Sequence, residues 1–182
     1  MMTYNTQWLI AHQTEKTEFV LFWGHQPSKD GSITKTCFSQ WWQSPFTVEN
    51  AVYLTAEHWM MAEKARLFKD ETIENAILST EKPAAVKALG RKIKDFDPSV
   101  WDAHKREIVV KGNVHKFGQN PELKAFLLAT GDKIIVEASP VDAIWGIGLS
   151  PDNPKALNPA TWRGENLLGF ALMEVRDLLK LF

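Results

Sequence analysis

The chain is poor in cysteine, with Cys37 alone among 182 residues. One thiol excludes an internal disulfide and any zinc site built from several cysteines, and it fits a reducing compartment. No histidine or asparagine stands near Cys37 in a recognisable catalytic arrangement. We therefore expect Cys37 to be a small, half-buried residue in a strand rather than a nucleophile.

The sequence also lacks long apolar runs and an excess of charge of one sign. No run approaches the length of a membrane span, and the first residues, MMTYNTQWLIAHQ, lack the basic-then-apolar pattern of a secretory signal. Twenty-one basic and 22 acidic residues give a net charge of −1. No general attraction to nucleic acid or to an anionic membrane is expected, so any phosphate site must be local. We expect a cytoplasmic protein; the sequence does not indicate its oligomeric state.

Several catalytic motifs are missing. There is no glycine-rich phosphate loop, no H-E-x-x-H and no G-x-S-x-G, and the five histidines are scattered at positions 12, 25, 58, 104 and 115. These absences argue against a metal enzyme and a serine hydrolase. We expect neither a metal nor an organic cofactor.

What the chain does contain is enough apolar sequence for one folded domain and eight tryptophans. We expect residues 1–17 to form a loosely held lead-in and residues 18–182 to form a single domain. Some of the tryptophans must lie in a core. The indole is also a flat surface on which a base stacks, so a pocket for a planar ring is a second expectation.

Apolar periodicity and turn residues predict an α+β fold that is predominantly α. The β-rich first third predicts strands at 18–23 and 33–38, as a hairpin or two short strands, and a tight hairpin at 46–53. The caps Thr55, Asp70 and Asp97 and three first-turn prolines predict the helices that follow. The remaining expected elements are helices at about 83–94, 98–117 and 121–130, the latter two stopped by Gly118 and Gly131, a strand at 133–137, a loop at 151–164 and a closing helix at 166–180. The sheet is expected to be small and antiparallel, or hairpins only.

Two charges lie on one face of the expected helix in the stretch YLTAEHWMMAEKARLF, residues 53–68. Glu57, Met60, Met61 and Lys64 follow helical spacing, which places the charges roughly 10 Å apart along the axis. An acid in the first turn interacts favourably with the helix dipole, and a lysine can extend its amine to solvent. The alternative is that both charges act on a substrate.

A second candidate is the stretch DAIWGIG, residues 142–148, which follows a strand and ends in glycines. It presents Asp142 and Trp145 where the backbone can turn sharply and a ligand can come close. The simpler reading is a strand-to-loop exit with Trp145 packed on the core. Arg91, in Gly90-Arg91-Lys92, is either a local phosphate contact or a solvated helix end.

Taken together, five stretches resemble the NADAR family, also called YbiA-like N-glycosidases, in order and spacing. These are TAEHWMMAEKA, LGRKI, the long helix with Trp101, IVEASPVDAIWGIG and ENLLGFALMEVR, and the resemblance runs from about Phe19 to the end of the chain. It implies a compact, mainly helical domain that hydrolyses the N-glycosidic bond between a ribose and a base or amine without a metal. Its two associated substrate classes are ribosylamino-pyrimidine intermediates of riboflavin synthesis and ADP-ribose attached to guanine or found in NAD-derived metabolites.

The resemblance assigns residues to the site. The helix acid and lysine correspond to Glu57 and Lys64, and the acid and indole of the second motif to Asp142 and Trp145. The wider set of expected substrate contacts is Trp23, Ser39, Arg91, Trp101, Trp145, Gly146 and Asn166. Each tryptophan is alternatively a core residue, and Asn166 alternatively caps the closing helix.

One departure concerns substrate choice. Where many relatives have S-N-F, this chain reads Phe38-Ser39-Gln40-Trp41, and it carries an insertion-like run, HQPSKDGSITKT. Because the amide of Gln40 and the ring of Trp41 are larger, the resemblance does not determine the substrate. It still implies the reaction class. The expected partner is a small-molecule or nucleic-acid-linked ribosyl substrate, with transient contact to single-stranded DNA in the second case.

Breaking a ribosyl C–N bond builds positive charge on the sugar, so the site needs an anion near C1 and a proton donor near the base. Glu57 and Asp142 can share these tasks in either order. Lys64 either attacks C1 of an opened ribose to form a Schiff base or remains a cation that binds a hydroxyl or phosphate. The rival to an enzyme is a module that binds ADP-ribose or a nucleotide without turnover, which has no need for this set of two acids and an amine.

Overall fold

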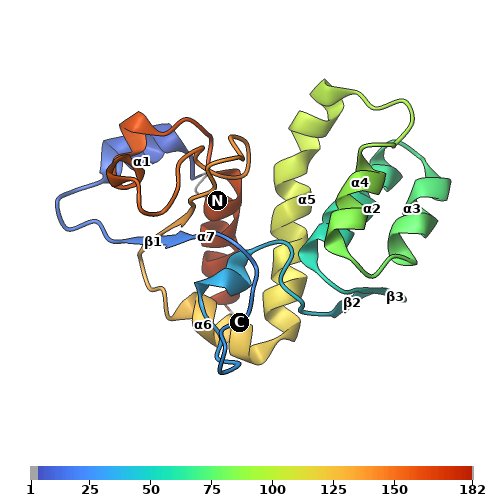
Figure 1. Ribbon diagram of the computed structural model, residues 1–182, viewed down its shortest axis with the longest axis horizontal. Helices are drawn as coiled ribbons and strands as arrows, with labels where there is room; N and C mark the ends of the chain where they lie inside the picture. The colour runs from blue at the N-terminus through green and yellow to red at the C-terminus, as the bar shows by residue number, and fades with distance from the viewer. Residues whose placement is uncertain (1–3, 182) are drawn as a thin grey trace. The chain divides into compact units, whose positions relative to one another are not determined.

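The computed structural model describes residues 4–181, and within it the chain forms two compact units. A continuous unit spans residues 40–121, and a discontinuous unit combines the segment before residue 40 with the segment after residue 121. The prediction of one domain over residues 18–182 placed no boundary at either point. Figure 1 shows the elements of both units along the chain.

The continuous unit consists of a hairpin followed by four helices. Strands β2 (Phe46–Val48) and β3 (Ala51–Tyr53) pair antiparallel, as predicted. The helices are α2 (Ala56–Leu67), α3 (Glu71–Leu78), α4 (Pro83–Gly90) and α5 (Pro98–Gln119). Helix α2 packs against the other three (Figure 1), and Trp59 anchors it to α5 by donating its indole N–H to the Ile108 carbonyl at 2.8 Å. Because neighbouring helices cover α2 on several sides, some of its polar side chains, such as Glu57 and His58, are buried.

The predicted helix starts are confirmed. The side chains of Thr55, Asp70 and Asp97 accept hydrogen bonds from the first turns of α2, α3 and α5, and Pro83 and Pro98 open their helices. The predicted ends are less accurate, because α4 ends at Gly90 and α5 continues through Gly118 to Gln119. One mid-helix glycine costs only about 1 kcal/mol, which the packing of a long helix exceeds.

The cap of α3 predicts a pH-dependent contribution to stability. Asp70 accepts hydrogen bonds from the N–H groups of Lys94 at 3.0 Å and Ile73 at 3.1 Å, and these bonds hold the pKa of its carboxyl below the ordinary value. A lowered pKa stabilises the fold above the unfolded-state pKa, and that stabilisation is lost as pH falls through the folded-state pKa. The variant Asp70→Asn should therefore be less stable than wild type at pH 7 and approach it toward pH 3 in urea unfolding. Glu71→Gln is the control on the same helix; an equal difference at both pH values would contradict the prediction.

The discontinuous unit contains a short parallel pair of strands. Strand β1 (Phe19–Phe22) pairs with β4 (Ile134–Glu137) in parallel, with Phe19 opposite Ile134, and helix α7 (Leu167–Leu179) packs on β4. The predicted strand at 18–23 is therefore confirmed, whereas its pairing in a hairpin or antiparallel sheet is wrong. The predicted strand at 33–38 is also wrong, since the 3₁₀ helix η1 (Lys35–Phe38) occupies it and Thr34 caps that helix. Cys37 is fully buried in η1 rather than half-buried in a strand.

The remaining elements of this unit connect these strands and α7. They are helix α6 (Pro121–Leu128), which begins at the unit boundary, and the 3₁₀ helices η2 (Pro154–Leu157) and η3 (Pro159–Thr161) in the predicted loop. The fold class is confirmed: helices predominate and the strands are few and short. Among the residues described, no helix is both long and apolar enough to cross a bilayer.

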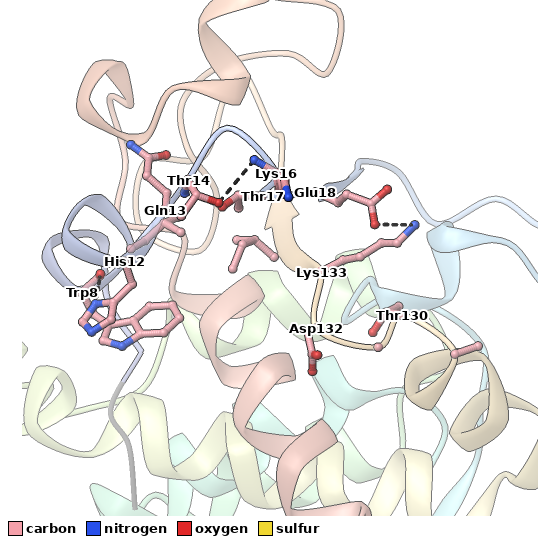
Figure 2. A pocket seen from close by; sticks show the side chains of 14 residues that line it. Trp8, His12, Gln13, Thr14, Lys16, Thr17, Glu18, Thr130, Asp132 and Lys133 are labelled. Atoms are coloured by element: carbon pink, nitrogen blue, oxygen red, sulfur yellow. Dashed lines mark hydrogen bonds and ion pairs between the residues drawn. The ribbon is translucent and has the colours of Figure 1, made fainter.

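Part of the predicted lead-in is ordered. Helix α1 (Thr6–His12) is capped by Asn5, whose side chain accepts from Trp8 N–H at 2.7 Å, and the Tyr4 hydroxyl donates to Asp177 at 2.5 Å. A pocket of about 560 Å³ lies beside α1. Figure 2 shows Trp8 and His12 on one side of it and the Lys133–Glu18 ion pair on another. The expectation of a loosely held segment is wrong for residues 5–12, although none of the predicted site residues lines this pocket.

Candidate functional site

Glu57 lies in the first turn of α2, where the sequence placed it, and its side chain is almost completely buried. Its backbone N–H donates to the carbonyl of Gln40 at 2.9 Å, which fixes the start of the helix to the segment before the hairpin. The neighbouring His58 has a structural role. It hydrogen-bonds Thr55 and the Thr80 carbonyl, each at 2.8 Å, and burial lowers its pKa. The acid of the motif is thus held rigidly by its surroundings.

Lys64 lies two turns further along α2, and it is half-buried in the continuous unit. Its Nζ donates to the Gly90 carbonyl oxygen at 3.0 Å and lies 4.1 Å from the centroid of the Phe96 ring and 5.4 Å from that of Trp101. Burial lowers the pKa of Lys64, and the negative charge of Glu57 acts in the opposite direction. The alternative of a lysine extended freely into solvent does not describe this amine.

Gly90 lies directly against α2. A Cβ atom at Gly90 would lie 2.1 Å from Met61 Sδ, so any side chain there would require the end of Met61 to move. Gly90 is the last residue of α4, and carbonyls at a helix C-terminus attract cations. Arg91 follows it as the exposed C-cap residue of α4. The LGRKI motif therefore supplies the acceptor of Lys64 as well as a basic side chain.

Phe96 is a site residue that the sequence analysis missed. It lies between α4 and α5, is 40% exposed, and packs its ring 5.2 Å from that of Phe68. The preceding residue, Asp95, has a φ of 51°, a left-handed conformation that turns the chain before Phe96. No helical or strand period places Phe96 on the face of Lys64, so pattern alone offered no signal for it.

A buried amide pair lies next to the start of α2. Asn113 Nδ2 donates to Gln40 Oε1 at 2.9 Å, and both side chains are at least nine-tenths buried. Within the described residues, Gln40 Nε2 and Asn113 Oδ1 have no hydrogen-bond partner. Buried polar atoms without a partner are uncommon and typically cost about 1–3 kcal/mol each, so this pair marks unused hydrogen-bonding capacity. Gln40 is one of the two residues at which this chain departs from S-N-F, and Trp41 is the other.

The DAIWGIG motif forms a tight turn in the discontinuous unit. Asp142 Oδ1 accepts from the N–H groups of Ile144 at 2.9 Å and Trp145 at 2.8 Å. Gly146 packs against the end of β4, where a Cβ would lie 2.8 Å from the Glu137 carbonyl oxygen. Asp142 and Trp145 are half-buried, so the motif is a strand-to-loop exit that still leaves an acid and an indole partly accessible.

Asn166 stands at the N-cap position of α7, but its side chain does not cap the helix as that alternative expected. It has a φ of 54°, and its side chain makes no cap hydrogen bond. Instead, Asn166 Oδ1 accepts from Glu137 N–H at 2.9 Å and Nδ2 donates to the Ile135 carbonyl at 3.0 Å, which ties the start of α7 to β4. The side chain is fully buried, so its observed role is to hold the start of α7 against β4.

The predicted site residues divide between the two units. Glu57, Lys64, Arg91 and Trp101 belong to the continuous unit, and Trp23, Ser39, Asp142, Trp145, Gly146 and Asn166 to the discontinuous one. Trp23 is 51% exposed after β1, and Ser39 ends η1. Within its unit the structure brings Lys64 together with Trp101, and Asp142 together with Trp145. Across the described chain, no group of three or more histidine, cysteine or acidic residues is arranged to hold a metal ion.

Comparison with known proteins gives a consistent family. A family model described as NADAR domain matches residues 21–180. N-glycosidase R617 of Acanthamoeba polyphaga mimivirus is 43% identical over 168 residues, which cover 90% of this chain and 97% of the viral protein. N-glycosidase YbiA of Escherichia coli K12 is 32% identical over 142 residues, 78% of each chain.

The fold is shared with a solved structure as well. The NMR structure of the E. coli protein YbiA matches with a TM-score of 0.71 and 28% identity, covering 92% of this chain and 88% of that chain. These matches confirm the predicted YbiA-like fold, and the names of the relatives confirm the prediction of an N-glycosyl hydrolase.

Proposed function

The chain belongs to the NADAR domain family, and from that membership we propose that it hydrolyses the ribosyl C–N bond of an ADP-ribosylated or ribosylamino substrate. The leaving group is either a guanine in nucleic acid or a pyrimidine intermediate of riboflavin synthesis. The observation that carries the proposal is the amine of Lys64, which lies at the end of α4 near two aromatic rings and under the influence of Glu57.

Two carboxylates supply the acid–base chemistry in this proposal. One of Glu57 and Asp142 stabilises the oxocarbenium-like sugar and activates water, and the other delivers a proton to the leaving base. The burial of Glu57 supports a catalytic use, because a buried carboxylate acts on the charge of Lys64 more strongly than an exposed one would. The turn around Asp142 leaves its carboxylate partly accessible, which supports contact with a substrate.

Lys64 is the nucleophile in this proposal. In the opened ribose, C1 is joined to the nitrogen of the base as a protonated imine. The neutral amine adds to C1 and a proton passes from Nζ to the departing nitrogen. The C1–N bond to the base then breaks as C1 and Nζ form their double bond. The product is a protonated Schiff base between C1 and Nζ, which water hydrolyses to the free aldehyde and the ammonium form of Lys64. The lowered pKa of Lys64 supports this role, because it increases the fraction of neutral amine at a given pH.

The remaining predicted contacts bind the substrate. Trp101 and Trp145 offer ring faces to a planar base, and the exposed Trp23 offers a third. Arg91, exposed at the end of α4, is a phosphate contact. A net charge of −1 favours a small ligand or a single displaced base over extended contact with DNA.

A side-by-side turnover assay tests the proposal. The two substrates are a ribosylamino-pyrimidine phosphate and single-stranded DNA carrying ADP-ribosylated guanine, without added metal and in the presence of EDTA. We expect one substrate to be cleaved with release of its base, and we expect EDTA to leave the rate unchanged. Inhibition by EDTA that added metal reverses would contradict the metal-free mechanism.

The rival function is a module that binds ADP-ribose or a nucleotide without turning it over. A thermal-shift titration with ADP-ribose distinguishes it from the enzyme when combined with the assay above. Stabilisation by ADP-ribose without cleavage of either substrate would favour the binding module and overturn the proposed hydrolysis.

A further inference from the structure

We infer that Phe96 and the Gly90 carbonyl form a cradle that holds the Lys64 nitrogen in its cationic forms, which makes Phe96 a positioning residue of the reaction. The inference deepens the proposed function and rests on it, because one of those cationic forms is the proposed covalent intermediate. Phe96 lies outside the sequence motifs, and Gly90 was named only beside Arg91 in the LGRKI motif.

The cradle has two parts that favour a positive charge. The last carbonyl of α4 accepts a hydrogen bond from Lys64 Nζ at 3.0 Å, and the Phe96 ring lies 4.1 Å from the same atom. The Trp101 ring, at 5.4 Å, forms the more distant wall. The face of an aromatic ring attracts a cation within about 6 Å of its centroid, and the attraction grows when the cation is partly removed from water. Phe96 is therefore the nearest aromatic contribution to the cradle.

Other charged groups near α2 are engaged elsewhere. On α2 and α3, Arg66 forms ion pairs with Glu63 and Glu74, and on α5 Lys105 pairs with Asp102 at 2.7 Å. On α4, Lys87 lies over the Trp41 ring, and Arg91 is exposed at the helix end. Glu57 is the charged residue whose field acts on the pKa of Lys64. With Glu57 unchanged, replacing Phe96 isolates the contribution of the ring.

The chemistry passes through two cations on the same nitrogen. Before reaction Lys64 is an ammonium ion that donates to Gly90. It loses one proton to become the attacking amine, and after the C1–N bond to the base has broken, the protonated Schiff base again carries a positive charge and retains one N–H. That N–H can keep the hydrogen bond to the Gly90 carbonyl, and the charge stays over the Phe96 ring. The cradle thus favours the intermediate by the same contacts that hold the resting ammonium.

The first measurement is the pKa of Lys64. The whole protein is labelled competitively with acetic anhydride across a pH series, and mass spectrometry gives the extent of labelling at Lys64. In Phe96→Leu, which keeps an apolar cover but removes the aromatic face, the pKa of Lys64 should fall by about 0.4–0.7 units, the equivalent of a cation–π contact of about 0.5–1 kcal/mol. Phe96→Tyr should restore the wild-type value. Lys111, which lies over Trp59, is the internal control in every sample and should not change.

The second measurement is borohydride trapping of the adduct at Lys64. The probes are ADP-ribose and ribose 5-phosphate, because the open form of either presents an aldehyde at C1 that condenses with the amine. Phe96→Leu should lower the trapped yield about threefold at saturating probe, and Phe96→Tyr should recover it. The probe that reacts at lower concentration identifies the sugar phosphate that the site takes.

The two measurements separate the failures. A Lys64 pKa that is unchanged or raised in Phe96→Leu, with normal trapping, would overturn the cradle and leave the proposed function standing. Turnover by wild type without any trapped adduct at Lys64 would overturn the covalent step, and the cationic intermediate of the inference with it. A lowered pKa together with a lowered yield, both restored by tyrosine, would support the inference, since a merely structural role of Phe96 would not respond to the aromatic face.

Discussion

Replacing Lys64 with alanine should lower kcat by about 10³-fold or more on whichever substrate the enzyme cleaves, because the variant loses the nucleophile of the proposed covalent step. Lys64→Arg should be about as inactive, since a guanidinium keeps the charge but is not deprotonated in proteins. The measurement is single-turnover release of the base with purified protein whose unfolding midpoint matches wild type.

The matched control for this pair is Lys111→Ala. Lys111 is also a helix lysine that lies over an aromatic ring, and its removal should leave kcat within about twofold of wild type. High activity in Lys64→Arg would contradict the covalent role and leave Lys64 as a cation that binds a hydroxyl or phosphate.

The second large effect is expected for Glu57→Gln, which preserves the shape of the buried side chain and removes its charge. We expect kcat/KM to fall by about 10²–10³-fold, the usual contribution of a positioned acid or base. The charge of Glu57 raises the pKa of Lys64 against the effect of burial. Its loss should therefore move the acid limb of the pH–rate profile to lower pH even as the maximum rate falls.

Glu63→Gln is the control for this variant, because Glu63 lies on the same helix but forms an ion pair with Arg66. A full pH–rate profile of the three proteins is the deciding measurement. An acid limb that stays at its wild-type position in Glu57→Gln would show that the two residues are not electrostatically coupled in the working enzyme.

The sequence predicted the local features of the fold well, because these depend on residues close together in the chain. Thr55, Asp70 and Asp97 begin helices as expected, and helical spacing correctly placed Glu57 and Lys64 on one face of α2. The tight hairpin around Glu49 and Asn50 also followed from local turn chemistry.

Features that depend on distant residues were missed. The pairing of β1 with β4 joins strands separated by the whole continuous unit. The sequence of β1 does not indicate whether its partner strand is parallel or antiparallel. Asn166 had a plausible local use as a cap, yet its amide is used on β4 instead. Phe96 reaches Lys64 through the turn at Asp95, a backbone geometry that periodicity does not describe.

The division of the chain also has a consequence for synthesis. Residues 40–121 form a unit that is continuous in sequence, so its helices can assemble as they leave the ribosome, and the many local contacts favour rapid folding. Strand β1 is synthesised before this unit, but it cannot pair until β4 emerges after the entire unit. During this interval an apolar strand with an unpaired edge is exposed to other chains. The nascent protein is therefore most vulnerable to aggregation at its N-terminal strand, and a chain that stops after residue 121 would carry that exposed edge permanently.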